Sequence, residues 1–455
     1  MMFAKAPAPV TSNPKPVLIK RFGHLVPLYP GEAEHLENDV HALAKADKHE
    51  AKQWKKIELA CNSPTALKKA AYLYLTSLRC RQAAMLEVNK RLPIARRLSL
   101  HQIIEKSNAF DVLTKLDEAV QVSLVPKSSG TGYRPICNFG PVARGAQRMV
   151  LKLVRATTTP APFQFTRLGV RKAIEEALRL ITEEGLHHVA ELDIKDHYPS
   201  FNAAKLVDTL PLPKAVVMQI VMAASAKYEG PHKALSLLFL NHVFHQTPPG
   251  IPQGSAASSA IAEWSVSKLK MVKIKGIAIV NFADNFFLFA KSEAALTFAL
   301  KALRSAIAGL PGGSFKTEVK QEATAASRFR MLGCWIKFTP AGLDVWPTET
   351  NLEALRCQFA LDLQTAEALL SSAAKEPSGS WRLEGVQAYL RLRSRIASWA
   401  AAYAFCADAE VVRDDLMWAL DYLAHRFGIT DAEAKAAKDP SVEVGYTPYG
   451  LSAGE

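Results

Sequence analysis

The sequence has no long apolar run and no paired cysteines. No stretch of about 18 apolar residues occurs, which argues against a membrane-spanning helix. The N-terminus lacks the apolar segment of a secretory signal. Six cysteines are scattered without a Cys-x-x-Cys pair, which argues against a zinc site or a disulfide framework. We therefore expect a cytoplasmic protein with reduced thiols and no membrane partner.

Acidic residues are also in deficit. The chain has 43 of them against 56 lysines and arginines, and its net charge is +13. This excess favours a polyanionic partner, although a basic protein without such a partner has the same composition. With 49% hydrophobic residues the 455-residue chain can bury several cores, which excludes wholesale disorder. The length predicts roughly two to four domains.

The N-terminal part concentrates the positive charge. Residues 1–100 contain 17 lysines and arginines but only 8 acidic residues. The first thirty residues are rich in proline and are expected to be extended. From residue 32 to residue 109 the apolar positions recur at helical spacing. Lysines such as Lys55 and Lys56 on these helices suit contact with a nucleic-acid backbone, or they form an ordinary solvated face.

Residues 280–291 organise the rest of the chain. Two apolar runs rich in strand-forming residues flank the pair Asp284 and Asn285. This pattern predicts a tight hairpin with both residues at its tip, where a carboxylate would stand clear of the sheet. Turn chemistry alone also explains the pair.

A second acid ends another expected strand, over residues 189–194. If that strand neighbours the hairpin, Asp193 and Asp284 meet at one edge of the sheet. Facing carboxylates repel one another unless a dication lies between them, and Mg²⁺ takes one or two carboxylates together with substrate phosphates. Two such ions can activate a 3′ hydroxyl and stabilise a leaving pyrophosphate.

Two loops offer groups for a phosphorylated ligand. Lys127 and Arg134 bracket a glycine-rich hairpin loop and could clamp a triphosphate, or they simply decorate a surface hairpin. Residues 250–255, Gly-Ile-Pro-Gln-Gly-Ser, force a sharp loop before a helix rich in small residues. Its backbone N–H groups and the Gln253 amide suit phosphate and sugar.

Five motifs in fixed order resemble bacterial reverse transcriptases of the group II intron and retron-like branch, most closely the antiphage defence-associated unknown-group enzymes. The resemblance covers residues 120–340, more weakly up to residue 407. The motifs are Lys127…Arg134-Pro-Ile, Asp193-Ile-Lys-x-x-Tyr198-Pro-Ser-Phe, Gly250-Ile-Pro-Gln-Gly-Ser255, Phe282-Ala-Asp284-Asn285 and Met331-Leu-Gly333.

The resemblance implies an α+β right-hand polymerase, with fingers, a palm built on an antiparallel sheet, and a helical thumb. On this basis residues 1–110 form an N-terminal basic helical extension and residues 111–346 the fingers and palm. Residues 347–427 form the thumb and residues 428–455 a C-terminal tail.

It also implies roles for individual residues. Asp193, Asp284 and the carbonyl of Ile194 would bind two Mg²⁺ ions. The nucleotide would contact Lys127, Arg134, the aromatic gate Tyr198 and Gln253, and Lys320, or less favourably Lys316, would help to protonate pyrophosphate. The nucleic acid would contact Gly333 in the primer grip, Arg391 and Arg395 in the thumb, and Lys55 and Lys56.

The implied function is RNA-directed DNA synthesis in antiphage defence, with non-templated or RNA-scaffolded synthesis as variants. Its partners would be dNTPs, a noncoding RNA, the DNA product, and a companion defence protein or a second copy of the chain. One departure from the family pattern is Asn285, which replaces the usual second aspartate. Because of this change, we expect the activity to be slower, to depend on Mn²⁺ in preference to Mg²⁺, or to be absent.

Two alternatives therefore stay open. The chain could be a catalytically impaired nucleic-acid-binding subunit partnered with an active polymerase. It could also be an RNA polymerase that copies RNA, although that class places an acid where this chain has Tyr198.

Overall fold

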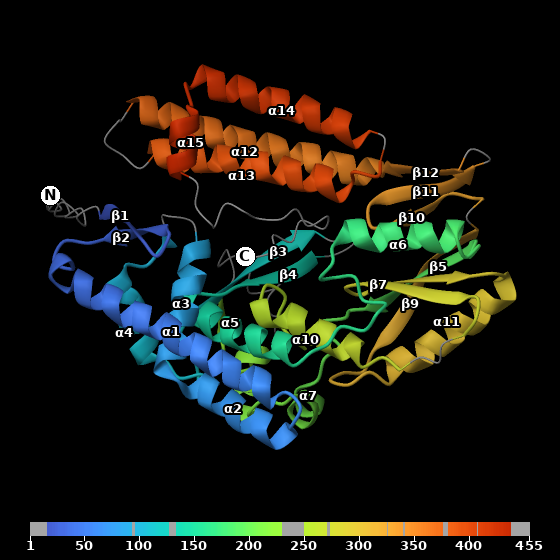
Figure 1. Ribbon diagram of the computed structural model, residues 1–455, viewed down its shortest axis with the longest axis horizontal. Coiled ribbons are helices and arrows are strands. Elements are labelled where there is room, and N and C mark those ends of the chain that lie inside the picture. Colours follow the sequence, from blue (N-terminus) through green and yellow to red (C-terminus); the bar gives the residue numbers. More distant parts are fainter. Residues whose placement is uncertain are drawn as a thin grey trace, which may run out of the picture.

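The computed structural model describes most of the chain as a mixed α+β protein. The N-terminal helices lie on one side of the molecule, a four-stranded sheet lies on the other, and the C-terminal helices form a layer above both (Figure 1). The described residues are 16–92, 96–126, 133–229, 250–270, 274–324, 326–339, 342–375, 381–406 and 408–437.

An N-terminal hairpin precedes four helices. Their bounds are β1 Val17–Arg21, β2 His24–Leu28, α1 Leu36–Ala60, α2 Pro64–Thr76, α3 Leu78–Arg91 and α4 Leu100–Ala109. The described residues here are extended, as expected, and the two strands pair as an antiparallel hairpin that the sequence analysis did not predict. Serines cap three of the helices, because the side chains of Ser63, Ser77 and Ser99 each accept the backbone N–H three residues later.

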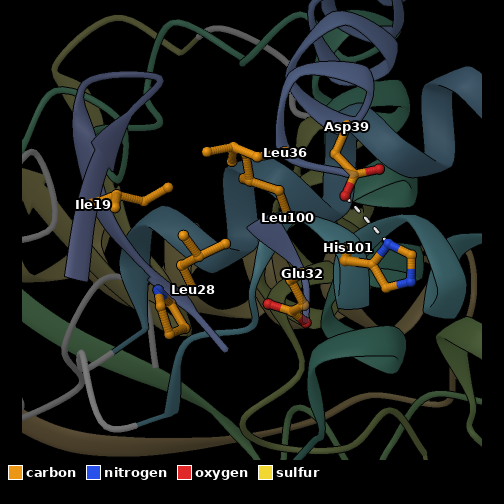
Figure 2. A pocket seen from close by; sticks show the side chains of 8 residues that line it. Ile19, Leu28, Glu32, Leu36, Asp39, Leu100 and His101 are labelled. Atoms are coloured by element: carbon orange, nitrogen blue, oxygen red, sulfur yellow. Dashed lines mark hydrogen bonds and ion pairs between the residues drawn. The ribbon is translucent and has the colours of Figure 1, made fainter. Parts of the chain in front are cut away.

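The hairpin packs against the first of these helices (Figure 2). Ile19 and Leu28 line a small pocket together with Leu36 of α1. Beside them, Nδ1 of His101 on α4 lies 3.2 Å from Oδ2 of Asp39 on α1. The hairpin, α1 and α4 therefore form one packed unit.

A second group of strands leads into helix α5. The bounds are β3 Ala119–Pro126, β4 Tyr133–Asn138, α5 Pro141–Ala156, α6 Val170–Thr182 and β6 Lys227–Glu229. β3 and β4 form the predicted antiparallel hairpin, and β6 pairs with β3 in parallel. The Glu118 carboxylate accepts the N–H groups of Val142, at 3.1 Å, and Ala143, at 2.8 Å. These bonds satisfy donors that the first turn of α5 would otherwise leave unpaired.

Two expectations are corrected in this part of the chain and in the C-terminal tail. The sequence favours helices over residues 214–226 and 232–244. In the first segment the helical stretch ends early, as α8 Lys214–Val216 and η3 Val217–Val221, and β6 follows. The predicted tail contains a helix, α15 Asp431–Ala437. The second segment lies outside the described residues, as does Lys127.

The central sheet is antiparallel, in the order β7-β8-β5-β9. Its strands and neighbouring helices are β5 His188–Lys195, β7 Ile277–Phe282, β8 Asn285–Ala290, β9 Lys316–Thr324, α7 Ala203–Thr209, α10 Ala256–Ser267 and α11 Glu293–Ala308. Strand β8 is apolar on both faces. Phe286 and Leu288 pack in one core with α11, whereas Phe287 and Phe289 pack in another with α6. Because helices cover both faces, β8 reads as a continuous apolar run rather than an alternating one.

The C-terminal part adds a small meander and long helices. They are β10 Phe329–Met331, β11 Cys334–Thr339, β12 Gly342–Pro347, α12 Glu349–Lys375, α13 Trp381–Ala402 and α14 Ala409–Arg426. The buried rings of Trp399 and Tyr403, at the end of α13, join the core beneath this meander. Arg382 of α13 binds Glu433 through two nitrogens, at 2.8 Å each, which attaches α15 to the layer.

One apolar core runs across the predicted boundary near residue 110. Polar contacts reinforce this packing between α1, α3 and α5. Nζ of Lys152 on α5 lies 2.9 Å from Glu50 of α1 and 2.9 Å from Glu87 of α3. The hydroxyl of Tyr74 on α2 donates to Glu50 at 2.9 Å. The N-terminal helices are therefore packed into the same body as the strands that follow.

None of the described helices is long and apolar enough to span a membrane.

Removing the Lys152 ammonium should destabilise the fold. In Lys152→Met two partly buried carboxylates, Glu50 and Glu87, lose their common cation, and we expect a loss of about 2–4 kcal/mol in unfolding free energy. Lys172→Met is the matched control, because Lys172 pairs with Glu175 on the surface and should change stability by less than about 0.5 kcal/mol. Urea denaturation compares the two variants. Equal midpoints would show that the buried network adds no stability.

Candidate active site

The two aspartates singled out in the sequence lie next to each other at one end of the central sheet. Asp193 of β5 is paired with Asn285 of β8, and the backbone N–H of Ile194 donates to the carbonyl of Asp284 at 3.1 Å. Residues directly opposite one another on antiparallel strands have Cβ atoms about 4.5–5.5 Å apart. The sheet therefore brings together two acids that are far apart in the sequence.

The hairpin turn is one residue earlier than expected. Phe282 pairs with Asn285, so the two-residue turn is Ala283 and Asp284, and Asn285 begins strand β8. Ala283 takes a φ of 55°, in the left-handed region. The Asn285 amide nitrogen donates to Oδ1 of Asp284 at 3.2 Å. Asp284 thus stands at the tip, as predicted, whereas Asn285 is a strand residue that hydrogen-bonds to it.

Burial disfavours the charged forms of both acids, and the charge of Asp284 adds to this effect at Asp193. The pKa of Asp193 is raised to about 6, first by burial and then by the nearby charge of Asp284. Burial also raises the pKa of Asp284, while the positive charges of Arg134 and Lys320 oppose that rise. Ionising both acids therefore costs free energy, and a cation bound between them would lower that cost.

The positive charge of Lys320 offsets part of the negative charge of the two acids. Its Nζ lies 3.6 Å from Oδ2 of Asp193 and 3.1 Å from Oε1 of Glu318, which is opposite Asp193 on β9. Burial lowers the pKa of Lys320, but its contacts with Glu318 and Asp193 outweigh this effect and the pKa is raised. Lys320 is therefore a protonated donor beside the acid pair.

Glu191 is a third acid that the sequence analysis missed. It is buried two residues before Asp193 on β5, and its Oε2 accepts a hydrogen bond from Gln321 at 3.0 Å. Burial raises its pKa to about 7, and the charges of Asp193 and Asp284 act in the same direction. Strand periodicity could have indicated it, since residues two apart on a strand share a face.

Asn281 holds the hairpin turn, and the sequence analysis missed it as well. Its buried amide nitrogen donates to the carbonyls of Ala283, at 3.0 Å, and Asn285, at 2.9 Å. The N–H of Ala283 donates to Oγ1 of Thr166 at 2.8 Å. These bonds fix the backbone on both sides of Asp284. No local sequence signal separates this asparagine from an ordinary strand residue.

The glycine-rich loop packs directly against the segment after Asp193. The N–H of Ile251 donates to the carbonyl of Tyr198 at 3.0 Å. Gly250 has a φ of 83°, and a Cβ there would lie 1.9 Å from the Tyr198 carbonyl oxygen, so no side chain fits. The ring of Tyr198 is half-buried, and burial followed by the charge of Asp284 raises its phenol pKa.

The same loop reaches strand β4. The N–H of Cys137 donates to the carbonyl of Gln253 at 2.7 Å, and a Cβ on Gly254 would lie 2.3 Å from the Cys137 carbonyl. Oε1 of Gln253 is buried and has no partner in the described part of the chain. Arg134 is exposed on β4, close enough to lower the pKa of Asp284. The loop thus connects the β3–β4 hairpin with the aspartates.

The remaining predicted residues lie elsewhere. The carbonyl of Gly333 accepts the N–H of Thr348 at 2.8 Å, so this turn is anchored to the start of α12. Arg395 pairs with Asp362 of α12, and Arg391 is exposed on α13. Lys55 and Lys56 are exposed on α1. Their nucleic-acid contacts stay predictions.

The donor set suits a hard dication. Asp193 and Asp284 offer carboxylate oxygens, and Ile194 and Asn285 can add a carbonyl and an amide oxygen, which are the ligand types of Mg²⁺. Within the described ranges no three His, Cys, Asp or Glu side chains are arranged to hold a metal ion. Side chains would thus supply two carboxylates, the number that Mg²⁺ commonly takes when phosphates and water complete its shell.

Comparisons with known proteins give little further information. No protein-family model matches the chain, and no curated protein matches its sequence. Many solved structures are similar at a low level, among them two telomerases. An apo telomerase from Candida tropicalis, truncated from its C-terminal domain, has 13% identity and a TM-score of 0.33 over 52% of this chain and 56% of that chain.

The other is a telomerase from Candida albicans in complex with a fragment of telomeric RNA. It has 12% identity and a TM-score of 0.32 over 80% of this chain and 68% of that chain. The chain thus spans little more than half of the first of these structures. A likeness at this level decides neither fold nor function, so the class rests on the chain's own features. They define a mixed α+β protein with an acid pair on an antiparallel sheet.

The pKa of Asp193 predicts a stability difference that depends on pH. Because the folded-state value, about 6, exceeds the ordinary 3.8, folding binds protons between these values, and ionised Asp193 destabilises the fold above pH 6. Without metal, Asp193→Asn should be more stable than the wild type by about 1–3 kcal/mol at pH 8, and the gain should vanish below pH 4. Thermal melts in EDTA measure this, and a gain that is the same at all pH values contradicts it.

The contribution of the Asn281 hydrogen bonds to stability can be tested by replacing the amide with a carboxyl group. Asn281→Asp removes the donor of two hydrogen bonds and buries a carboxyl group beside two carbonyls, so we expect a loss of about 2–3 kcal/mol. Asn202→Asp is the matched control, since Asn202 caps α7 only as an acceptor and aspartate accepts the same bonds. Comparable urea midpoints for the two variants would show that the Asn281 hydrogen bonds do not stabilise the turn.

Proposed function

We propose that the chain is an RNA-directed DNA polymerase of reverse-transcriptase type, acting in the cytoplasm in antiphage defence. One observation carries the proposal. Asp193 and Asp284, from separate strands, meet at one end of an antiparallel sheet, where their pKa values are raised and a lysine lies beside them. The assignment to defence follows from the motif resemblance.

In this proposal Asp193, Asp284 and the Ile194 carbonyl hold two Mg²⁺ ions, which would lower the pKa of a primer 3′ hydroxyl and neutralise the triphosphate. The protein's share is positioning. Strands β5 and β8 hold the two carboxylates at the same end of the sheet. The hydrogen bonds of Asn281 keep the turn that carries Asp284 in place. Ionised Asp193 and Asp284 repel each other, which favours binding of the cations.

Groups around the aspartates would bind the dNTP. Arg134 and Lys127 would hold the triphosphate, and Lys320, protonated beside Asp193, would donate a proton to the departing pyrophosphate. Tyr198 would clash with a ribose 2′ hydroxyl. The unpartnered amide oxygen of Gln253 supports a contact with the nucleotide, because a buried acceptor without a bond is otherwise costly.

Asn285 supports a second candidate, an impaired subunit that binds nucleic acid beside an active polymerase. Its amide nitrogen donates a hydrogen bond to Asp284, so the side chain supports this acid but adds no negative charge of its own. We favour the active enzyme because the Asp193–Asp284 pair is complete without Asn285.

The polymerase proposal predicts how single substitutions change nucleotide incorporation. Purified protein with Mg²⁺ should extend a DNA primer on an RNA template with dNTPs in preference to rNTPs. Asp284→Ala should lower the rate by at least about a hundredfold, whereas Asn285→Asp should raise it by restoring the lost charge.

Asp208→Ala, on the exposed side of α7, is the control and should leave the rate unchanged. Extension that persists in Asp284→Ala would defeat the proposal. A preference for rNTPs would favour the RNA-polymerase alternative, and wild-type protein that binds nucleic acid without extending it would favour the impaired subunit.

We expect the exposed lysines of α1 and α2 to contact the RNA backbone. Replacing Lys55, Lys56, Lys68 and Lys69 with glutamine should weaken RNA binding and reduce its dependence on salt, since each phosphate contact releases a counterion. Filter binding at several salt concentrations measures this. The control is glutamine at Lys205 and Lys227, distant in sequence from these helices. If the variant with all four substitutions binds RNA with unchanged affinity and salt dependence, these lysines do not contact the RNA.

A further inference from the structure

The outer face of helix α14 carries aromatic and acidic side chains at helical spacing. We call it the acidic face, and it consists of the exposed residues Val411, Asp414, Asp415, Trp418, Asp421 and Tyr422; exposed His425 and Arg426 follow at its C-terminal end, where Arg426 pairs with Glu367. Trp418 is 73% exposed and Tyr422 is 60% exposed. Their rings stack with centroids 6.3 Å apart. The other side of α14 is buried through Val412, Leu420 and Leu423, so the acidic face is not part of the core.

This face differs from an ordinary solvated helix surface because large apolar side chains, Val411, Trp418 and Tyr422, lie exposed among its aspartates. Large aromatic side chains in a row on a helix already packed on its other side mark a binding surface. Asp415 and Asp421 form no ion pair within the described part of the chain, and Asp414 pairs only with its neighbour Arg413. A face of this charge repels phosphates, so its partner is a basic protein surface with apolar side chains, and not a nucleic acid.

The chain itself presents such a surface on α1. We call it the lysine face, and it consists of the exposed residues Lys45, Lys48, Lys52, Lys55, Lys56 and Leu59. Leu59 is 86% exposed. None of these five lysines forms an ion pair within the described residues. Helix α2 packs against α1 and has exposed apolar residues of its own, Tyr72 and Leu73.

The two faces also match in length. At about 1.5 Å per residue, the lysine face extends for about 21 Å and the acidic face for about 17 Å. Figure 1 shows α14 along the upper edge of the molecule and α1 and α2 along the lower edge, so one copy cannot bring its own two faces together.

We propose that the acidic face of α14 in one copy docks on the lysine face of α1 in a second copy. Neither face can pair with itself, because like charges would then oppose each other. The contact is therefore heterologous, and it joins copies head to tail into a ring or an open chain. Trp418 and Tyr422 would be covered by the apolar residues beside the lysines, while the aspartates meet the ammonium groups.

This contact and RNA use the same lysines of α1. A docked α14 presents carboxylates where RNA would present phosphates, so RNA and the neighbouring copy exclude each other on this face. The contact itself does not require polymerase activity.

Charge-reversed variants test the contact directly. One variant carries Asp415→Lys and Asp421→Lys, and the other carries Lys52→Glu, Lys55→Glu and Lys56→Glu. A control carries Asp208→Lys and Asp344→Lys, which reverse exposed charges on α7 and β12. Light scattering after gel filtration gives the mass of nuclease-treated protein at low and high salt.

We expect the wild type and the control to assemble with rising concentration at low salt and to dissociate at high salt or on adding a short single-stranded RNA. Each variant alone should associate at least about tenfold more weakly. An equimolar mixture of the two variants should assemble again, because each reversed face then meets a complementary one. Circular dichroism verifies that both variants fold.

Three results would overturn the proposal. One is a wild type that stays monomeric at every concentration in low salt. Another is assembly by each variant as strong as that of the wild type. The third is a mixture of the two variants that fails to assemble although both are folded and the wild type assembles.

Discussion

The pairing of strands β5 and β8 places two like charges side by side, and the rest of the site depends on it. Asp193 lies opposite Asn285 and beside the turn that carries Asp284. Burial raises the pKa of both acids, and the charge of Asp284 raises that of Asp193 further. The apolar packing of Phe286 and Phe287 on the two faces of β8 offsets this cost. A rigid, doubly covered strand can hold a charge arrangement that a flexible loop would relax.

Close backbone contacts then join the distant motifs into one site. Gly250 allows the loop to touch the Tyr198 carbonyl, and Gly254 allows it to touch Cys137 of β4. These contacts have no room for a Cβ, so the loop has little freedom relative to the sheet. The backbone positions of Gln253 and Tyr198 near the aspartates are therefore set by main-chain contacts.

The net charge of +13 is unevenly distributed. The lysine face of α1 and the acidic face of α14 lie at opposite edges of the molecule (Figure 1). A protein with this polarity attracts polyanions at one edge and repels them at the other. The buried network of Glu50, Glu87 and Lys152 keeps α1 attached to the body, so its surface lysines have a defined position.

The sequence by itself determined the local elements and the two principal acids. Turn chemistry at Asp284 predicted the hairpin, and an apolar run predicted a strand that ends at Asp193, because each signal lies within a few residues. The sequence made the meeting of the two carboxylates conditional on neighbouring strands, and the pairing of β5 with β8 fulfils that condition. The position of Asn285 was wrong by one residue, since asparagine favours turns in general but the pairing of Phe282 with Asn285 set the turn.

Only the tertiary structure decided which polar residues support the site. Strand periodicity could place Glu191 on the same face as Asp193, but the contact of Glu191 with Gln321 and the contact of the Asn281-bound turn with Thr166 depend on segments far along the chain. The parallel pairing of β6 with β3 and the anchoring of Gly333 at α12 are nonlocal in the same way. Local propensity does not contain such information, because it arises when distant segments bury a common surface.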